Sequence, residues 1–326
     1  MGPIPKENLQ FHFEFGGHAN RKDAAGIKKT LERLKPHVFV MEEALMTRDE
    51  RIDAIKTVNR LARASKTDPE RKKFLRGISE DRSIFGHGEF KVMEFVHAIH
   101  SGLTIFFVEE MGEEERNEAF WSLPWLVRFN PKIMDLLREG RVTEAMSLSE
   151  ASFRETTGAL VSSRDPVIAC GIERMRFELP ELFPERDWSG EVRVLARYGS
   201  MHGAAGAMLS ARGYEVESDF VCRGIAEELS MALSLDPNIE FSPEQKAQIL
   251  FMDVSQQIFP LVQDSASADS ETLSQNYRAL GAEGFFAILH ELAGRRMDEA
   301  TFKSALREAL QTARESAEIS AFAGNP

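Results

Sequence analysis

Apolar and polar residues alternate near the start of the chain in the pattern of a β-strand that leads into a helix. Phenylalanine occupies every second position from Phe11 to Phe15, which gives the period of two expected for a strand with one buried face. A Gly-Gly turn relaxes the backbone after this stretch, and Asn20 is a suitable N-cap for the helix whose apolar spacing covers 21–35. The predicted unit is therefore strand, turn and helix, with His18 in the turn.

Four apolar runs farther along the chain predict four more strands. They cover residues 38–41, 102–108, 191–198 and 214–220. The first of these runs is apolar throughout, which is typical of a parallel strand buried on both faces. The last run alternates apolar and polar residues, so we expect it at an edge of the sheet. Because helical spacing separates the runs, the sequence predicts an α/β fold with a mostly parallel central sheet of about five strands.

Helical segments interrupt and follow this α/β pattern. Two long stretches, at about 44–90 and 113–163, predict large helical insertions, and a further helix is expected to begin near Arg164. The rest of the chain shows helical spacing almost to its end. We therefore expect an α/β core over 1–222 that carries both insertions, and a C-terminal helical region over 223–326 that packs on the core.

The composition narrows the classes of function. The chain has 326 residues, of which 43% are hydrophobic, which is enough for a large core. Its formal net charge of −12 at pH 7 argues against a nucleic-acid-binding protein. Its two cysteines form no CxxC motif or disulfide framework, its first residues show no signal-peptide pattern, and no apolar run is long enough to span a bilayer. We therefore expect a cytoplasmic protein without a membrane span or a nucleic-acid partner, and composition leaves its oligomeric state open.

Three of the predicted strands end at residues that can carry chemistry. His18 and His202 each follow a strand and a glycine turn, and Glu42 follows the second strand directly. Because the carboxyl ends of parallel strands lie at one edge of a sheet, we expect these three side chains to converge. Two imidazoles and a carboxylate can bind a divalent metal ion or form a metal-free acid–base set. A helix N-terminus is also expected to lower the pKa of each histidine and keep it neutral.

Each motif also has an ordinary explanation. Glycine after a strand is common turn chemistry, and one histidine beside it is usually incidental. The repetition at two strand ends, with an acid at a third, favours the functional interpretation. Elsewhere, Glu94, His97 and His100 place three possible ligands on one helix, although solvated or core histidines explain this spacing more simply. His290 lacks the second histidine of a zincin motif, and Tyr198 is expected to be structural.

The order of these motifs resembles the TraB and Tiki group, which belongs with the erythromycin-esterase-like and ChaN-like proteins. The matching stretches are Gly16-Gly17-His18, Lys35-Pro36-His37-Val38-Phe39-Val40-Met41-Glu42 and Gly199-Ser200-Met201-His202. Between them, Arg164-Asp165-Pro166 resembles the arginine motif of the family at the start of a helix. Order and placement agree over about residues 9–220. The first motif departs from the pattern, because Phe15 stands where a glycine is expected, and His18-Ala19-Asn20 is close to the ChaN-like form.

The resemblance implies an erythromycin-esterase/ChaN-like core and a site, but it does not select one reaction. The group includes metal-dependent proteases, a macrolide esterase, haem-binding proteins and regulators. The first hypothesis is a hydrolase in which water attacks an ester or peptide bond of a small-molecule or peptide substrate. His18, Glu42 and His202 would form its centre, with or without a divalent metal ion bound to these three residues.

Arg164 would position the substrate or stabilise an oxyanion in this hypothesis. The ordinary explanation is an arginine at an exposed helix start, which the following Asp-Pro sequence favours. The alternative function is a non-catalytic protein that uses the same cleft to bind haem or a peptide, or to regulate another protein.

Overall fold

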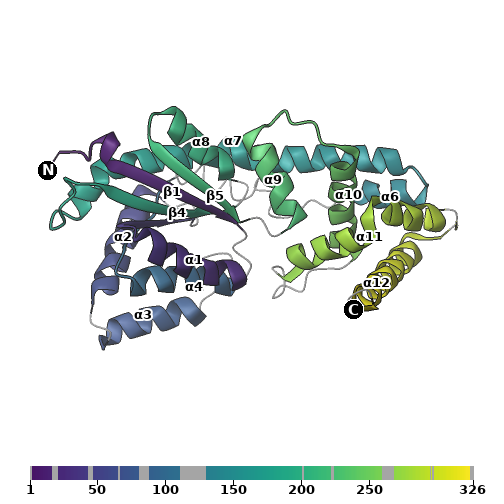
Figure 1. Cartoon of the computed structure of the whole chain (residues 1–326), viewed down its shortest axis with the longest axis horizontal. Coiled ribbons are helices and arrows are strands. Elements are labelled where there is room, and N and C mark those ends of the chain that lie inside the picture. Colours follow the sequence, from purple (N-terminus) through teal and green to yellow (C-terminus); the bar gives the residue numbers. More distant parts are fainter. Residues whose placement is uncertain are drawn as a thin grey trace. The chain divides into compact units, whose positions relative to one another are not determined.

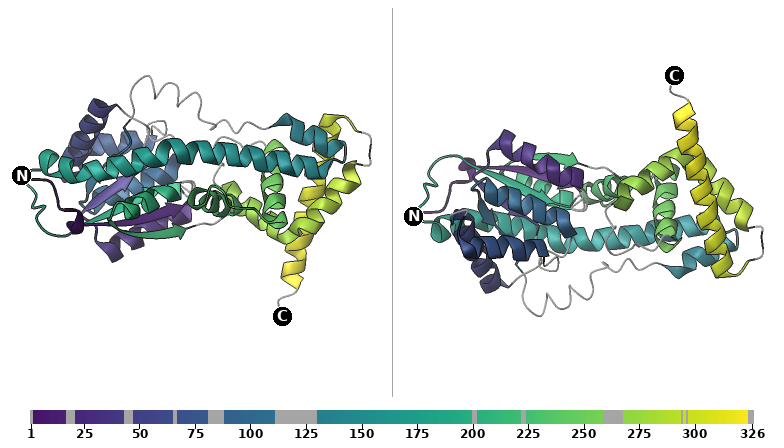
Figure 2. Two further views of the ribbon diagram at one scale, coloured as in Figure 1. Left: turned by 90° about the horizontal axis from the view of Figure 1, so that it is seen from above. Right: turned by 90° about the horizontal axis from the view of Figure 1, so that it is seen from below.

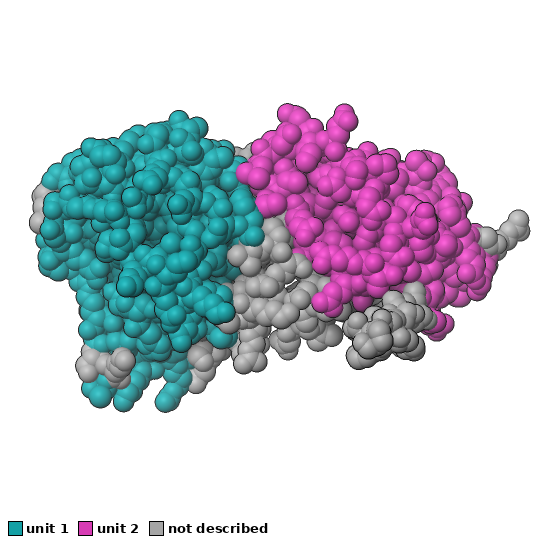
Figure 3. Space-filling view, viewed as in Figure 1, with its two compact units in different colours: residues 1–123, 159–222 teal, residues 124–158, 223–326 magenta. Residues whose placement is uncertain are grey.

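The computed structural model of the chain forms two compact units, which are described separately (Figure 3). It describes residues 2–16, 21–42, 47–64, 67–80, 88–110, 130–199, 202–221, 224–258, 268–293, 295 and 297–323. The first unit consists of residues 1–123 and 159–222, and the second consists of residues 124–158 and 223–326. This division places residues 124–158 with the C-terminal helices rather than with the α/β core.

A five-stranded sheet with the strand order β3-β2-β4-β1-β5 forms the centre of the first unit (Figure 1). The strands are β1 (Leu9–Gly16), β2 (Val38–Met41), β3 (Thr104–Phe106), β4 (Val192–Tyr198) and β5 (Glu215–Val221). All four neighbouring pairs run parallel. The predicted α/β fold with a parallel sheet of five strands is therefore confirmed, and β5 lies at an edge as expected.

The register of the sheet brings the ends of β2 and β4 to the same level. Met41 pairs with Arg197. The backbone N–H of Glu42 donates to the carbonyl of Arg197 over 3.0 Å. The first residue after β2 therefore lies beside the last residues of β4, which is the arrangement expected at the carboxyl edge of a parallel sheet.

Helices cover both faces of this sheet (Figures 1 and 2). On one face lie α1 (Arg21–Leu34) and α4 (Gly88–His100), which contact each other. Here Thr30 of α1 donates to the Glu14 carboxylate over 2.6 Å. On the other face lie α8 (Gly203–Ala211) and the part of α7 (Val142–Leu182) that belongs to the first unit, from residue 159 onward. A Cβ atom at Gly206 of α8 would lie 3.7 Å from the rings of both Phe13 and Phe15, so the alternation along β1 sends its phenylalanines to this second face.

The helices α2 (Arg48–Arg63) and α3 (Pro69–Glu80) complete the first unit. The side-chain amide of Asn59 on α2 pairs with the outer edge of β3 in place of another strand. It donates to the Ile105 carbonyl over 2.7 Å and accepts from the Ile105 N–H over 2.9 Å. The exposed backbone groups that make an edge strand a template for further pairing are thus satisfied at this residue.

The helix α7 is much longer than the helix predicted from about Arg164, and the prediction of a helix start there was wrong. Arg164 lies well inside α7, and Pro166 and Pro180 are both accommodated within it. Proline removes an N–H donor from a helix, which is why the sequence indicated a boundary. The buried side chains of Ile168 and Ile172 continue the apolar face past Pro166, so packing maintains the helix across the break in its hydrogen bonds.

Gly171 allows α7 to approach the end of β3 closely. A Cβ atom at this position would lie 2.1 Å from the carbonyl oxygen of Val108 and 2.8 Å from its Cβ. The approach holds the part of α7 that carries Arg164 against the residues that follow β3.

The second unit is helical and has its own apolar core. It contains α6 (Pro131–Arg138), the first part of α7, α9 (Ile225–Leu235), α10 (Pro243–Ile258), α11 (Ala268–Ala293) and α12 (Glu299–Ala323). Phe251 of α10 packs edge-on against Tyr277 and Phe285 of α11, with ring centroids 5.2 Å apart in each pair. The predicted helical C-terminal region is confirmed. Among the residues described, no helix is long and apolar enough to cross a membrane.

The close approach at Gly171 predicts that Gly171→Ala destabilises the chain by about 3 kcal/mol or more, because a backbone oxygen blocks the added methyl group and the helix must shift. The matched control is Gly26→Ala in α1, where no described atom lies within 4 Å of the new Cβ. Alanine there should stabilise by about 1 kcal/mol through its helix propensity. Chemical denaturation of both variants measures the difference. Equal effects of the two substitutions would show that the approach is not tight.

Candidate functional site

Five charged or titratable side chains gather at the carboxyl edge of the sheet in the first unit. We call them the strand-end cluster. Its members are Glu42 after β2, Glu109 after β3, Arg164 and Asp165 on α7, and His202 at the start of α8. Each residue is at most 5% exposed. Ionised groups are buried this completely only where other charges or hydrogen bonds compensate for the lost water.

Arg164 connects the ends of two neighbouring strands. Its Nη1 donates to Glu42 Oε1 over 3.2 Å, and its Nε and Nη2 donate to Glu109 Oε2 over 2.9 and 2.5 Å. Burial opposes the charge of the guanidinium, but Glu109 and Glu42 outweigh this effect and raise the pKa of Arg164 above its usual value. Arg164 is therefore a permanent cation that neutralises part of the charge of the two glutamates.

The carboxylate of Glu42 is also fixed by the turn after β4. Its Oε2 accepts a hydrogen bond from the backbone N–H of Gly199 over 2.8 Å. Both oxygens of Glu42 thus have protein donors, one from α7 and one from the turn. This fixes the position of the carboxylate relative to His202, which follows the same turn.

His202 lies between two carboxylates. Its Nδ1 is 2.6 Å from Asp165 Oδ1, and its Nε2 is 3.6 Å from Glu42 Oε1. Asp165 accepts a hydrogen bond from Nδ1–H, since a carboxylate has no proton to donate. Nε2 faces Glu42. Asp165 and Glu42 therefore hold the imidazole from opposite sides.

The charge state of His202 differs from the prediction. Burial lowers the pKa of His202, but the charge of Glu42 and the hydrogen bonds to Asp165 and Glu42 raise it to about 9. Burial also raises the pKa of Asp165, although the nearby His202 opposes this effect. The proton that Asp165 and His202 share is therefore lost only at high pH. The predicted lowering by the helix dipole was wrong, because two adjacent carboxylates outweigh the dipole of the short helix α8. His202 is an imidazolium near neutral pH.

The predicted metal site is only partly within the described chain. His202 and Glu42 lie together, whereas His18 lies outside the described residues. A histidine whose second nitrogen donates to a carboxylate is typical of metal ligands, but here a guanidinium contacts the other candidate ligand, Glu42. No three His, Cys, Asp or Glu side chains in the described part of the chain are arranged to hold a metal ion. The described residues alone do not fit a metal, and metal binding through His18 stays a prediction.

The weaker histidine candidates lie elsewhere. On α4, Glu94 forms a buried ion pair of 3.0 Å with Arg197, His97 is half-buried and His100 is exposed. His290 is exposed on α11 in the second unit. None of these side chains belongs to the strand-end cluster.

Sequence reasoning missed two members of the cluster, Glu109 and Asp165. Glu109 follows the third predicted strand in the same way as Glu42 follows the second, so the rule that selected Glu42 applies equally to Glu109. Asp165 adjoins Arg164, but the Asp-Pro sequence suggested a helix cap instead of a buried partner for histidine. Its role depends on α7 passing His202, which no local pattern shows.

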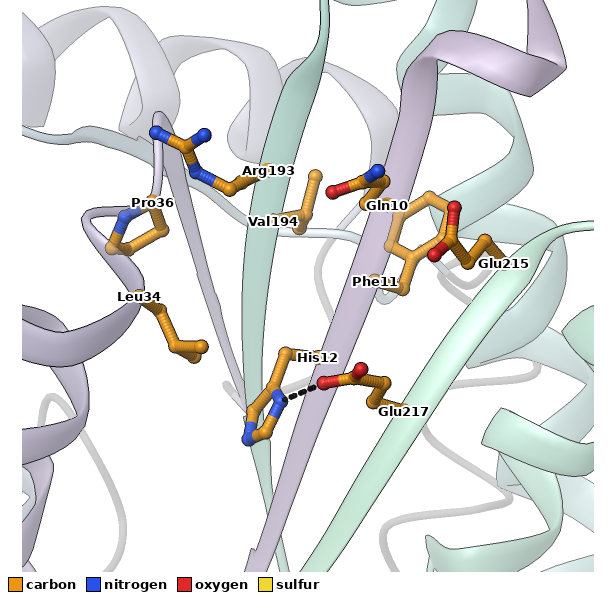
Figure 4. Close-up of a pocket in the computed structure, with 9 residues that line it drawn as sticks. All are labelled: Gln10, Phe11, His12, Leu34, Pro36, Arg193, Val194, Glu215 and Glu217. Carbon is orange, nitrogen blue, oxygen red and sulfur yellow. Dashed lines mark hydrogen bonds and ion pairs between the residues drawn. The ribbon is translucent and has the colours of Figure 1, made fainter.

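A separate cavity of about 80 Å³ lies toward the amino-terminal half of the sheet (Figure 4). It is lined by Gln10, Phe11, His12, Leu34, Pro36, Arg193, Val194, Glu215 and Glu217. His12 points toward Glu217 across it, with 3.4 Å between Nδ1 and Oε2, and its Nε2 is 3.0 Å from Asp219. The cavity contains no member of the strand-end cluster.

Comparison of the chain with protein-family models, with curated proteins and with solved structures finds no significant match in any of the three. The resemblance to the TraB and Tiki group stays a prediction.

The geometry around His202 predicts that Asp165→Asn lowers the pKa of its imidazole by about one unit or more, because an amide no longer stabilises the imidazolium by charge. NMR titration of the imidazole measures this directly. The control is Glu94→Gln, which removes a buried carboxylate on the face of the sheet covered by α1 and α4. It should leave the titration of His202 unchanged. An imidazole already neutral at pH 7 in the unaltered protein would contradict the assignment.

Proposed function

We propose that the strand-end cluster is the active site of a hydrolase that acts on an ester or peptide bond, with Glu42 and His202 as its base and acid. The observation that supports this proposal is the position of His202 between two carboxylates. Nδ1 lies 2.6 Å from one carboxylate, that of Asp165, and Nε2 lies 3.6 Å from the other, that of Glu42.

The two reacting groups have complementary charge states. Glu42 is a paired carboxylate that can take a proton from water, and His202 is an imidazolium that can give a proton to the leaving group. Asp165 orients His202 and stabilises its charge, as the acidic member of a catalytic triad does. His18, Glu42 and His202 together remain the centre proposed from the sequence.

Arg164 has a different role in this proposal from the one first expected. Each of its three nitrogens donates to a carboxylate. It therefore holds Glu42 and Glu109 in position, and we assign it this role in place of oxyanion binding. This makes Arg164 a positioning residue.

The second candidate is a non-catalytic protein that binds a ligand such as haem or a peptide, or that regulates another protein. One observation favours it: the charges of the cluster largely neutralise one another within a buried network, and such networks also occur as purely structural features. The two candidates differ in what the removal of one charge does to turnover.

The test is Glu42→Gln, which keeps the volume and removes the charge and basicity. Hydrolysis of p-nitrophenyl acetate and of fluorescently labelled casein should fall by ~10²-fold or more, the usual scale for the loss of a general base. The control is Glu94→Gln, whose carboxylate is 1% exposed and paired with Arg197, so that a buried Glu–Arg pair is lost at a distance from His202.

The structural alternative gives a different pattern. If Glu42 only balances Arg164, its replacement should lower the free energy of unfolding by ~3 kcal/mol and leave turnover unchanged. Thermal melts and rates measured on the same preparations distinguish the two cases. A destabilised Glu42→Gln variant with unchanged rates would remove Glu42 from the mechanism.

A further inference from the structure

Tyr198, the last residue of β4, has a hydroxyl group that nothing in the described chain satisfies. The residue is fully buried, and its hydroxyl oxygen has no hydrogen-bond partner among the described groups. Its ring packs against Phe13 at 6.3 Å and meets the His202 imidazole edge-on at 5.9 Å. Tyr198 thus adjoins the strand-end cluster directly.

A buried hydroxyl without a partner is unfavourable, and folded proteins rarely contain one without a reason. Phenylalanine would make the same ring contacts without this cost. Within the cluster, Glu109 Oε1 is likewise buried without a hydrogen-bond partner in the described chain. Two unsatisfied polar atoms, one beside the ion pairs and one within them, favour this edge of the sheet as the place where a polar ligand binds.

The charges around Tyr198 determine what its hydroxyl can do. Burial raises the pKa of Tyr198 well above its usual value, and the negative charges of Glu109 and Glu42 add to this effect. The phenol therefore keeps its proton at neutral pH. It can donate a hydrogen bond, but it is not a base or a nucleophile.

The other donor groups in the described part of the cluster each face a carboxylate, and Nε2 of His202 lies 3.6 Å from Glu42 Oε1. All three nitrogens of Arg164 donate to glutamates, the Gly199 N–H donates to Glu42, and Nδ1 of His202 donates to Asp165. The Tyr198 hydroxyl is a neutral donor beside His202 that is still available to a ligand.

We propose that Tyr198 donates a hydrogen bond to the carbonyl oxygen of the substrate and stabilises the oxyanion that forms there. This inference rests on the proposed hydrolase function. It assigns to Tyr198 the oxyanion role that the sequence suggested for Arg164. A donor that is fixed in a buried site stabilises a developing charge strongly, since it needs no reorganisation during the reaction.

The reaction balances with these residues alone. Water adds to the carbonyl carbon, its proton passes to Glu42, and the π electron pair moves onto the carbonyl oxygen, which Tyr198 binds. The carbonyl then re-forms and the bond to the leaving group breaks, and the leaving group takes the proton of His202. Transfer of the proton from Glu42 to His202 restores both groups, and Tyr198 keeps its proton throughout.

The test is Tyr198→Phe, which removes one oxygen atom and keeps the ring. With p-nitrophenyl acetate, kcat should fall by about 10²-fold or more, as it does when an oxyanion donor is lost, while KM changes less than about twofold. Thermal stability should be unchanged or higher, because an unsatisfied hydroxyl is removed. The matched control is Tyr214→Phe, which removes a buried tyrosine hydroxyl that donates to Glu173 in the same unit and should leave kcat unchanged.

The outcomes separate this inference from the proposed function. An unchanged kcat for Tyr198→Phe, with turnover lost in Glu42→Gln, overturns the role of Tyr198 and leaves the hydrolase proposal in place. If kcat falls equally in Tyr198→Phe and Tyr214→Phe, the role of Tyr198 is structural. The same holds if Tyr198→Phe lowers the melting temperature together with kcat. Unchanged turnover in all three variants, or an unaltered protein that is inert to both probes, overturns both proposals.

Discussion

The pairing of one buried arginine with two glutamates is the interaction on which the site depends. Moving an isolated charge out of water costs several kcal/mol or more even after the protein relaxes, on the order of the whole stability of a domain. Arg164 is 5% exposed, so its charge is tolerated because Glu42 and Glu109 meet it from two strand ends. The close approach of α7 to Val108 at Gly171 places Arg164 for this pairing, and the pairing helps to fix the position of Glu42.

The same sheet has a second buried Glu–Arg pair on its opposite face, between Glu94 and Arg197. The comparison shows what distinguishes the strand-end cluster. At the carboxyl edge, the ion pairs adjoin an imidazolium and a buried tyrosine hydroxyl that has no hydrogen-bond partner in the described chain. An ion pair alone indicates only that two charges are balanced, whereas a buried hydroxyl donor without an acceptor beside it favours a site that binds a ligand.

The sequence was informative where a local pattern determines structure. Alternation and apolar runs predicted the five strands, and the parallel order placed Glu42 and His202 at one edge before any contact was known. The charge of His202, the burial of Arg164 and the participation of Glu109 and Asp165 were not predictable in this way. Each depends on a long helix passing the strand ends, and Pro166 concealed the length of that helix. His18 lies outside the described chain, so its part in the site remains a prediction.

The edges of the sheet also determine how copies of this chain can meet. Beyond β3, the amide of Asn59 occupies the backbone N–H and carbonyl of Ile105, two groups to which a strand from another molecule would bind. At the other edge, β5 carries Glu215, Glu217 and Asp219, so that a second copy aligned along it would bring two acidic rows together. At the β3 edge a side-chain amide takes the hydrogen bonds of a neighbouring strand, and at the β5 edge acidic side chains repel a second copy. Both features oppose the addition of a further strand to the sheet.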